Sequence, residues 1–420
     1  MPTPELSKPF CVQFHDAVRQ APPPMELRQL GSGLPESIPF SHLKALLTEG
    51  LAHVFDSGAV ASFGPGAEDP ITSELCRSLS EIVRSPVTDE QFLTTVGASD
   101  GLSSILDFCG DHGIGVVLPL PCYFGYELAA LNAGVRIAGY YDAATTRFTW
   151  RNPGGPLCLV VNTPDAISGY TLEIEGLRSL EAQLGRQLRL TVVDLICAMQ
   201  RPDPAVDSSS IADLWGNSTA PGKALLFGVT KDLALPGLRA GLLLSDDLSL
   251  LEGVRWRVLG RSFSAGVFVP VVMGMYLHLL ASIESRKGYH IQSEVFPGLT
   301  STIVNEFHEH RKRDSVAYQK ARSMLNTEVP ELLLPSPTHQ AGYSVLATMA
   351  NGVKGVDAAK ERTQRLLTQG LKINPTYMFG GDPDLWNALR PGELHLRVNL
   401  STPASELGRD ASEAVRALRA

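Results

Sequence analysis

The sequence lacks several features that would place it in a specialised class of protein. No apolar run approaches the ~20 residues that a helix needs to cross a bilayer, so we expect no membrane partner. Positive charge is in the minority: 36 Lys and Arg stand against 44 Asp and Glu, and no basic stripe appears, which argues against a nucleic-acid partner. The N-terminal MPTPELSKPF shows no signal pattern, and we therefore expect a cytoplasmic protein.

Paired cysteines are also missing. The six cysteines contain no C-x-x-C motif, and they are Cys11, Cys76, Cys109, Cys122, Cys158 and Cys197. This scatter indicates neither a zinc site nor a disulfide framework. His308 and His310 lie two residues apart on an expected helix and so face different sides, which favours a solvated helix over a metal site. We expect no metal.

The regular alternation of apolar runs with helical patterns is what the sequence does show. The chain of 420 residues is long enough for two domains. From about residue 92 to 245, helical patterns separate seven apolar runs of strand length: FLTTV, GIGVVLPL, VRIAGYY, PLCLVV, LRLTVV, KALLFGV and AGLLLS. This alternation predicts an α/β fold with a mostly parallel sheet covered by helices on both faces. Ligands bind such sheets beyond the carboxyl ends of the strands.

The segment GVTKDLALPGLRAG, residues 228–241, carries the strongest chemical signal. Lys231 follows an apolar run, and burial there disfavours the charged amine and makes it a better nucleophile, as a Schiff-base lysine requires. Arg239, returned by the turn at Pro236 and Gly237, offers a planar donor fork suited to a phosphate. Together they describe a site for pyridoxal 5'-phosphate. By spacing alone, a surface lysine with an unrelated arginine explains the segment equally well.

Two further segments favour the cofactor. In TTVGASDGLSSIL, residues 94–106, small residues at a helix start let backbone N–H groups approach a phosphate, and Ser99 adds a hydroxyl. Asp100 could instead cap an ordinary helix. In LRLTVVDLICA, Asp194 ends an apolar strand, where a carboxylate needs a partner and a protonated pyridine nitrogen would provide one. An aspartate in a common strand-to-loop turn is the alternative.

Taken in order, these segments resemble the fold-type-I pyridoxal-phosphate enzymes of the class I/II aminotransferase superfamily, from about Leu30 to Ser401. LGSGLPESIPF is similar to the family's N-terminal substrate loop, SFGPGAEDPITSEL to its YG-x-x-x-G segment, and PLPCYFGYELAALNAG to P-x-P-x-Y-x-x-Y. NTPDAISGYTL is similar to NTP-x-NPTG, VVDLICA to V-x-D-x-x-Y, and ELHLRVNLS to the C-terminal segment with the family's arginine. The stretch FGGDPDLWNALRPGELHLRVNLS resembles valine–pyruvate aminotransferases in particular.

The resemblance implies an architecture: the pyridoxal-phosphate-dependent transferase fold type I, with a large domain built on a mostly parallel sheet and a smaller C-terminal α/β domain. We expect residues 1–55 to form an N-terminal arm and part of the small domain, residues 56–298 the large cofactor-binding domain, and residues 299–420 the small domain. The resemblance also implies a homodimer with the site at its interface.

The resemblance also assigns site residues. The catalytic lysine falls on Lys231. The cofactor-binding positions fall on Ala98, Ser99, Asp100, Tyr123, Asp194, Thr230, Lys231 and Arg239, with Tyr123 stacked on the pyridine ring. The substrate-binding positions fall on Gly33, Asn162 and Arg397, of which Arg397 would bind the substrate carboxylate. Three further arginines either bind an anionic substrate side chain or are surface charges: Arg255, Arg257 and Arg261.

Four positions depart from the family pattern. The asparagine that bonds the cofactor's phenolic oxygen falls on Ala166, which cannot donate, and the tyrosine that bonds the same oxygen falls on Cys197, at best a weak donor. Phe63 stands where a partner subunit supplies a tyrosine to the phosphate, and Gly228 where a serine often reaches it. After a small shift in the alignment, three residues could substitute near the phenolic oxygen: Asn162, Asp165 and Ser168.

These features predict a pyridoxal-phosphate-dependent enzyme that acts on an α-amino acid through an external aldimine and a quinonoid carbanion, with Lys231 as the base. An aminotransferase is the first hypothesis. The altered Ala166 and Cys197 favour the alternative, β- or γ-elimination, replacement or cyclisation in specialised metabolism, for example on S-adenosylmethionine. Some transcription regulators carry this fold, but they need an added DNA-binding module, for which we see neither room nor a basic segment.

Overall fold

A computed structural model of the protein describes most of the chain. The described residues are 8–20, 27–35, 40–61, 68–201, 209–262, 264–285, 292–335, 341–349, 355–389 and 393–419. Phe63, at the expected position of a partner-supplied tyrosine, lies outside them. Within these ranges, none of the helices combines the length and the apolar character that crossing a membrane requires.

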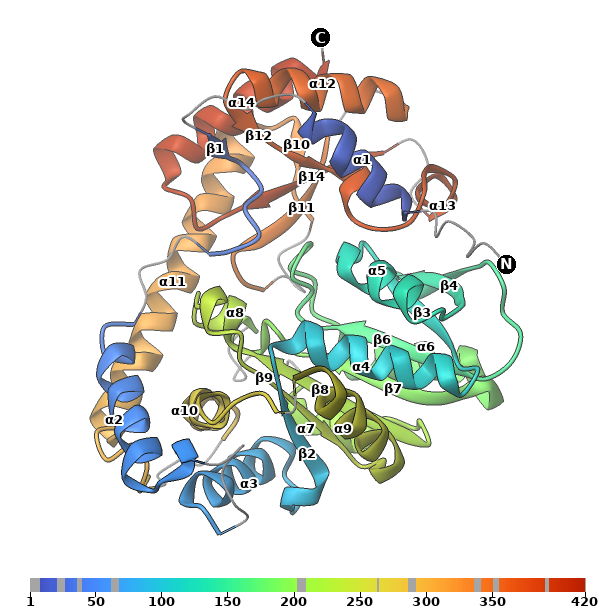
Figure 1. Ribbon diagram of the computed structural model, residues 1–420. Coiled ribbons are helices and arrows are strands. Elements are labelled where there is room, and N and C mark those ends of the chain that lie inside the picture. Colours follow the sequence, from blue (N-terminus) through green and yellow to red (C-terminus); the bar gives the residue numbers. More distant parts are fainter. Residues whose placement is uncertain are drawn as a thin grey trace.

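Eight strands form the large sheet (Figure 1). Their spatial order is β2 (Phe92–Thr95), β9 (Gly241–Ser245), β8 (Gly222–Gly228), β7 (Leu188–Asp194), β6 (Leu157–Asn162), β3 (Gly115–Leu120), β4 (Ile137–Asp142) and β5 (Arg147–Trp150). Strands β9 and β5 run antiparallel to their neighbours, and the other pairs are parallel. The mostly parallel sheet expected from the sequence is therefore confirmed, and all seven apolar runs contain a strand.

Helices cover both faces of this sheet and make three layers. One face carries α4 (Ala98–Asp111), α5 (Phe124–Asn132) and α9 (Leu248–Ser262). The other carries α3 (Pro70–Val83), α6 (Ile174–Leu184), α7 (Ile211–Asn217) and α10 (Phe268–Glu284). Alternate strand residues enter the two cores, so that Val116 and Leu118 pack on one side and Val117 on the other. Burial on both sides explains why the central strands are continuous apolar runs.

A second, smaller sheet builds the C-terminal part of the molecule. Its strand order is β10 (Leu332–Leu333), β11 (Ser344–Met349), β14 (Leu394–Asn399) and β13 (Asn374–Pro375), all antiparallel. The helices of this part are α11 (Ser301–Glu328), α12 (Val356–Thr368), α13 (Pro383–Leu389) and α14 (Ala404–Arg419). The long α11 runs beside both parts of the molecule in Figure 1, and the Thr300 side chain caps its start by accepting from the Ile303 N–H.

The N-terminal segment contacts both parts. Helix α1 (Phe10–Arg19) packs on α12, and β1 (Arg28–Gln29) pairs in parallel with β12 (Leu371–Lys372), whereas α2 (Leu43–Asp56) packs on α10. The domain boundaries expected from the sequence stay a prediction. Short helical segments complete the described structure: η1 (Ala59–Ala61), η2 (Asp89–Gln91), η3 (Gly185–Gln187), η4 (Ala198–Gln200), α8 (Val229–Asp232), η5 (Pro236–Leu238) and η7 (Thr376–Met378).

The parallel strands place the chemistry-bearing side chains at one edge of the large sheet. Asn162 ends β6 and Asp194 ends β7, and the two residues are register partners. Lys231 lies on the single turn α8 that follows β8, and Tyr123 directly precedes α5, after β3. Because the carboxyl ends of parallel strands share an edge, residues distant in sequence gather there.

Candidate active site

Asp194 is a buried carboxylate held in a fixed orientation at the end of β7. The Tyr126 hydroxyl donates to its Oδ2 at 2.6 Å, and the Ile196 N–H donates to its Oδ1 at 3.1 Å. Burial raises the pKa of Asp194 to about 6, although both hydrogen bonds act in the opposite direction. A cationic partner would therefore be needed to keep this carboxyl fully ionised near neutral pH.

Lys231 reaches the same edge from α8. Its Nζ donates to the Gly33 carbonyl oxygen at 2.5 Å, which ties the large domain to the N-terminal segment. Burial, followed by the positive charge of Arg397, lowers the pKa of Lys231 to about 8, while Cys197 and Asp194 oppose the shift. A substantial fraction of this amine is then neutral near physiological pH, as a nucleophile or a base requires.

Gly97 and Arg239 form a cradle at the start of α4. Gly97 has a positive φ of 80°, and a Cβ there would lie 3.2 Å from the Arg239 Nη2. Gly241 also approaches closely, since its Cβ would lie 2.6 Å from the Ala98 nitrogen. Glycine is thus required at both positions. The first N–H groups of a helix have no intrahelical partners, so the exposed Ser99, beside this cradle, lies where an anion would be bound.

Asp100 and Thr230 lie near these residues, but their contacts do not assign a single role to either of them. The Asp100 Oδ2 accepts from the Val96 N–H at 3.2 Å, which closes the turn before α4, whereas the N-cap position falls on Gly97 and has no side-chain cap. Thr230 is half-buried beside Lys231. Their expected contacts with the cofactor stay predictions.

Tyr123 is close enough to Arg239 and Asp194 for both charges to act on its phenol. Its side chain is 44% exposed, and its ring stands edge-on to Tyr126 with centroids 5.9 Å apart. Burial raises the pKa of the Tyr123 phenol, the Arg239 charge lowers it and the Asp194 charge raises it, so both charged groups act on this ring. A partly open aromatic face at this position suits stacking on a heterocycle.

Arg397 comes from β14 of the small sheet and bridges the two parts of the molecule. Its Nε donates to the Ser344 Oγ at 3.0 Å, and its Nη2 donates to the Ala166 carbonyl oxygen at 2.7 Å. A Cβ on Gly33 would lie 3.4 Å from Nη1 and 3.9 Å from the Lys231 Nζ. Two hydrogen bonds therefore fix the orientation of the guanidinium, and its remaining edge faces Gly33 and Lys231.

The Asn162 amide and the Ser168 hydroxyl bond within the protein. The Asn162 Nδ2 donates to the Asp194 carbonyl oxygen at 3.0 Å, and its Oδ1 accepts from the Ala166 N–H at 3.0 Å. The Ser168 hydroxyl donates to the Asp165 Oδ2 at 2.5 Å. The residues that the sequence offered as substitutes near Ala166 thus hold their own loop in shape.

Two residues of the site had no role assigned from the sequence. The Tyr343 hydroxyl donates to the Gly33 carbonyl oxygen at 3.0 Å, the same atom that accepts from Lys231. The Asp232 Oδ2 accepts from the Met199 N–H and the Tyr276 hydroxyl, and burial raises the pKa of Asp232 to about 7. Asp232 follows the lysine directly, which is a local signal, whereas Tyr343 carries no motif.

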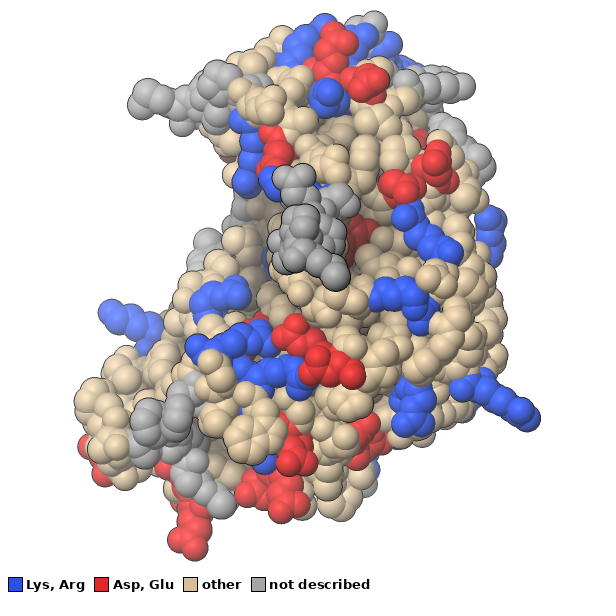
Figure 2. Space-filling model, turned by 45° about the vertical axis from the view of Figure 1, so that its right-hand side comes forward, with Lys and Arg blue, Asp and Glu red and all other residues tan. Residues whose placement is uncertain are grey.

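The three arginines considered for an anionic side chain lie on α9. Arg261 donates to Asp100, Ser104 and Asp107 of α4, Arg257 pairs with Asp111, and Arg255 is exposed. On the face shown in Figure 2, charges of both signs are interspersed, and the surface is hollowed between the upper and lower parts of the molecule. Among the described residues, no three metal-ligating side chains gather.

Comparisons with known proteins identify the fold. No protein-family model matches the chain, and no match was found among curated proteins. Among solved structures, the chain is similar to a proposed kynurenine aminotransferase of Saccharomyces cerevisiae, with a TM-score of 0.71, 16% identity, and coverage of 98% of this chain and 96% of that one.

Two further solved structures are similar over nearly their full length. A Thermus thermophilus aspartate aminotransferase double mutant gives a TM-score of 0.67, 18% identity, and coverage of 100% and 97% of the two chains. An aromatic aminotransferase of Pyrococcus horikoshii gives a TM-score of 0.67, 17% identity, and coverage of 97% and 98%. With its eight-stranded, mostly parallel sheet and smaller C-terminal α/β part, the chain therefore has the fold of these aminotransferases, the expected fold type I.

Proposed function

We propose that the protein is a pyridoxal-phosphate-dependent enzyme that acts on α-amino acids, and that its reaction is transamination. The observation that carries the proposal is the meeting at Gly33 of Lys231, from the turn α8 after the large sheet's β8, and Arg397, from β14 of the small sheet. An amine with a lowered pKa beside a buried guanidinium provides a nucleophile next to a carboxylate receptor. The aminotransferase fold of the chain supports the same conclusion.

The residues at the sheet edge fit pyridoxal 5'-phosphate. Arg239 and the start of α4, at Ala98, Ser99 and Asp100, would hold the phosphate, and the glycine cradle at Gly97 leaves room for it. Asp194 would pair with the ring nitrogen, and Tyr123 would cover the ring. Thr230 would contribute beside Lys231. When bound, this group supplies an electron sink for a carbanion at the substrate α-carbon.

The protein's own side chains then have distinct tasks. Arg397, held by Ser344 and Ala166, would bind the substrate α-carboxylate bidentately, and Gly33 and Asn162 would line the same place. The Lys231 Nζ would accept the α-proton, because its pKa of about 8 keeps part of the amine neutral. Asp194, ionised by its cationic partner, would keep that partner protonated.

Elimination, replacement or cyclisation at the β- or γ-carbon is the second candidate. It is favoured by Ala166 and Cys197, which cannot provide the family's two donors to the phenolic oxygen, and by the internal bonding of Asn162 and Ser168. A reaction in specialised metabolism, such as one on S-adenosylmethionine, would fit altered cofactor surroundings.

Single-turnover experiments with a panel of amino acids, S-adenosylmethionine included, separate the two. Transamination releases a keto acid and leaves the bound cofactor in its amine form. A cofactor that stays an aldehyde while a side-chain group is released would favour the second candidate. Absence of bound cofactor after incubation with pyridoxal 5'-phosphate would contradict both.

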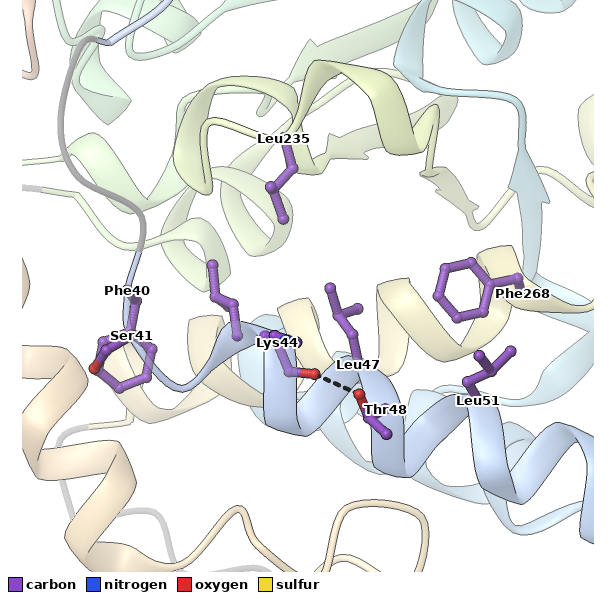
Figure 3. Close-up of a pocket in the computed structure, with 9 residues that line it drawn as sticks. Phe40, Ser41, Lys44, Leu47, Thr48, Leu51, Leu235 and Phe268 are labelled. Atoms are coloured by element: carbon purple, nitrogen blue, oxygen red, sulfur yellow. Dashed lines mark hydrogen bonds between the residues drawn. The ribbon is translucent and has the colours of Figure 1, made fainter.

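We also propose that the protein is a homodimer, with a second copy covering an apolar groove beside the lysine loop. The groove has a volume of about 510 Å³, and its lining residues are Phe40, Ser41, Leu43, Lys44, Leu47, Thr48, Leu51, Leu235 and Phe268. In Figure 3, α2 forms one wall and Leu235, four residues after Lys231, approaches from the opposite side. Leu51 and Phe55, one helical turn apart on α2, are 43% and 61% exposed, and neighbouring exposed apolar side chains of this kind are typical of an interaction surface.

A cytoplasmic location is proposed as well. All six cysteines are free, and five of them are buried. Free thiols are typical of a reducing compartment.

A further inference from the structure

The proposed cofactor has a phenolic oxygen for which the chain's aligned positions provide no strong donor. Ala166 has no side-chain donor, and its carbonyl oxygen accepts from Arg397. Cys197 is buried, and its thiol is at best a weak donor. A buried anionic oxygen needs hydrogen bonds, because without them its desolvation is not compensated. Another donor should therefore lie at this edge of the sheet.

Tyr343 is a phenol in the right neighbourhood. It directly precedes β11, its own carbonyl oxygen accepts from the Leu400 N–H at 2.6 Å, and its side chain is 1% exposed. Its hydroxyl lies 3.0 Å from the Gly33 carbonyl oxygen, and the Lys231 Nζ lies 2.5 Å from that same oxygen. The phenol and the lysine amine thus meet at one atom.

The charges around Tyr343 keep it a donor. Burial raises the pKa of its phenol well above the usual range, and the negative forms of Cys197, Asp232 and Tyr318 raise it further, while the Arg397 charge lowers it. The hydroxyl therefore remains protonated, and able to donate, near neutral pH. Cys197, the position where the donor is missing, is among the groups whose charge acts on this phenol.

We propose that Tyr343 donates the hydrogen bond to the cofactor's phenolic oxygen that Ala166 and Cys197 cannot. This inference rests on the proposed function. The donor then comes from the small sheet and not from the end of β7. β11 pairs with β14, and Ser344, next in sequence, accepts from the Arg397 Nε, so the donor and the carboxylate receptor share one rigid unit. Substrate binding at Arg397 is thereby linked to the hydrogen bonding of the cofactor.

Tyr343→Phe tests the assignment, because it removes the hydroxyl and keeps the ring. The readout is the visible absorbance of the bound cofactor against pH, without substrate. A hydrogen bond draws charge from the phenolic oxygen, so its loss leaves more negative charge beside the protonated lysine linkage and holds that proton more tightly. We expect the midpoint of the titration to rise by about one pH unit, and the affinity for pyridoxal 5'-phosphate to fall about tenfold.

Two further variants sharpen the test. Tyr141→Phe is the matched control, since it removes a buried phenol that donates to the Val160 carbonyl oxygen at 3.0 Å, and it should leave the midpoint unchanged. Ala166→Asn, added to Tyr343→Phe, restores a family donor and should return the midpoint toward that of the unchanged protein. In the unchanged protein, Ala166→Asn should shift the midpoint by less than about half a unit, because the oxygen already has a donor.

The outcomes separate this inference from the proposed function. If the unchanged protein binds no cofactor at Lys231, the proposed function fails and the inference with it. If the cofactor is bound at Lys231 but Tyr343→Phe titrates like the unchanged protein, only the inference is overturned. Should Tyr343→Phe not fold, Ala166→Asn alone decides: a small shift supports the role of Tyr343, and a shift of a full unit refutes it.

Discussion

The two sheets contribute to the candidate site in different ways. At the large sheet, Asp194 ends the buried strand β7, and Lys231 lies on the turn α8 that follows the buried strand β8. The positions of both residues therefore follow from the strand pattern. At the small sheet, Tyr343 directly precedes β11 and Arg397 lies on the neighbouring β14, and their approach to Gly33 depends on tertiary packing. On the proposed function, the large sheet would provide the reactive groups, and the small sheet would provide groups that position the cofactor and bind the substrate.

Among the substitutions proposed, replacing Lys231 should have the largest effect on activity. Lys231→Ala should abolish borohydride-trapped cofactor and lower turnover by about a thousandfold or more, because it removes both the nucleophile and the base. Peptide mass analysis after reduction locates the label. Lys223→Ala, on the preceding strand, is the control and should keep the label in place. Trapping on any other lysine would contradict the assignment.

Replacing Arg397 of the small sheet tests substrate binding separately from the chemical reaction. Arg397→Ala should weaken amino-acid binding by about a hundredfold while the cofactor stays bound, since it removes charge-assisted hydrogen bonds to a carboxylate. Spectral titration with amino acid measures the change. Arg257→Ala, which loses a pair with Asp111 and hydrogen bonds to the Gly253 and Asp107 carbonyl oxygens, serves as the control. Equal amino-acid affinity in both variants would remove Arg397 from the site.

The carboxylate of β7 should affect stability in a pH-dependent way. Burial raises the pKa of Asp194 to about 6 in the folded protein, above its ordinary value of 3.8. A raised pKa stabilises the fold at low pH, and that contribution is lost as the pH rises through about 6. In urea unfolding of cofactor-free protein, the unchanged protein should therefore lose about 2 kcal/mol relative to Asp194→Asn between pH 4 and pH 8. Parallel stability curves would show that Asp194 is solvated.

The proposed dimer face lies outside both sheets and should respond to charge. Phe55→Glu should weaken self-association about tenfold or more, because it places a carboxylate in an apolar contact. Analytical ultracentrifugation over a range of protein concentrations measures this. Val316→Glu, an exposed apolar position on α11, is the control. A monomeric unchanged protein would remove the interface altogether.

The smallest effect is expected at α9. Arg261→Ala removes exposed pairs with Asp100 and Asp107 and should cost less than about 1 kcal/mol of unfolding free energy. Amino-acid preference should stay as it is. A changed preference for acidic amino acids, seen in competition assays, would bring Arg261 into the substrate site.

The sequence allowed the large sheet to be predicted well because burial on both faces produces long apolar runs. Strand β5 escaped this reasoning, since its residues Arg147–Trp150 lie at the sheet edge with exposed ends. Lys231, Asp194 and Arg397 were found because each stands in a family motif. Tyr343 was not, because its role depends on the distance between its hydroxyl and a carbonyl more than 300 residues away. Such a contact leaves no local pattern.

The Gly33 carbonyl oxygen holds two site residues together in the cofactor-free protein. In the structure it accepts from both Lys231 and Tyr343, so the two donors are already gathered at one point before any cofactor arrives. If the proposed cofactor binds here, loading would exchange hydrogen-bond partners that are already in place, which would limit the entropy lost on binding. The exchange would also release the N-terminal segment at Gly33 from two hydrogen bonds. Binding of the cofactor would then loosen the segment next to the proposed carboxylate receptor, Arg397.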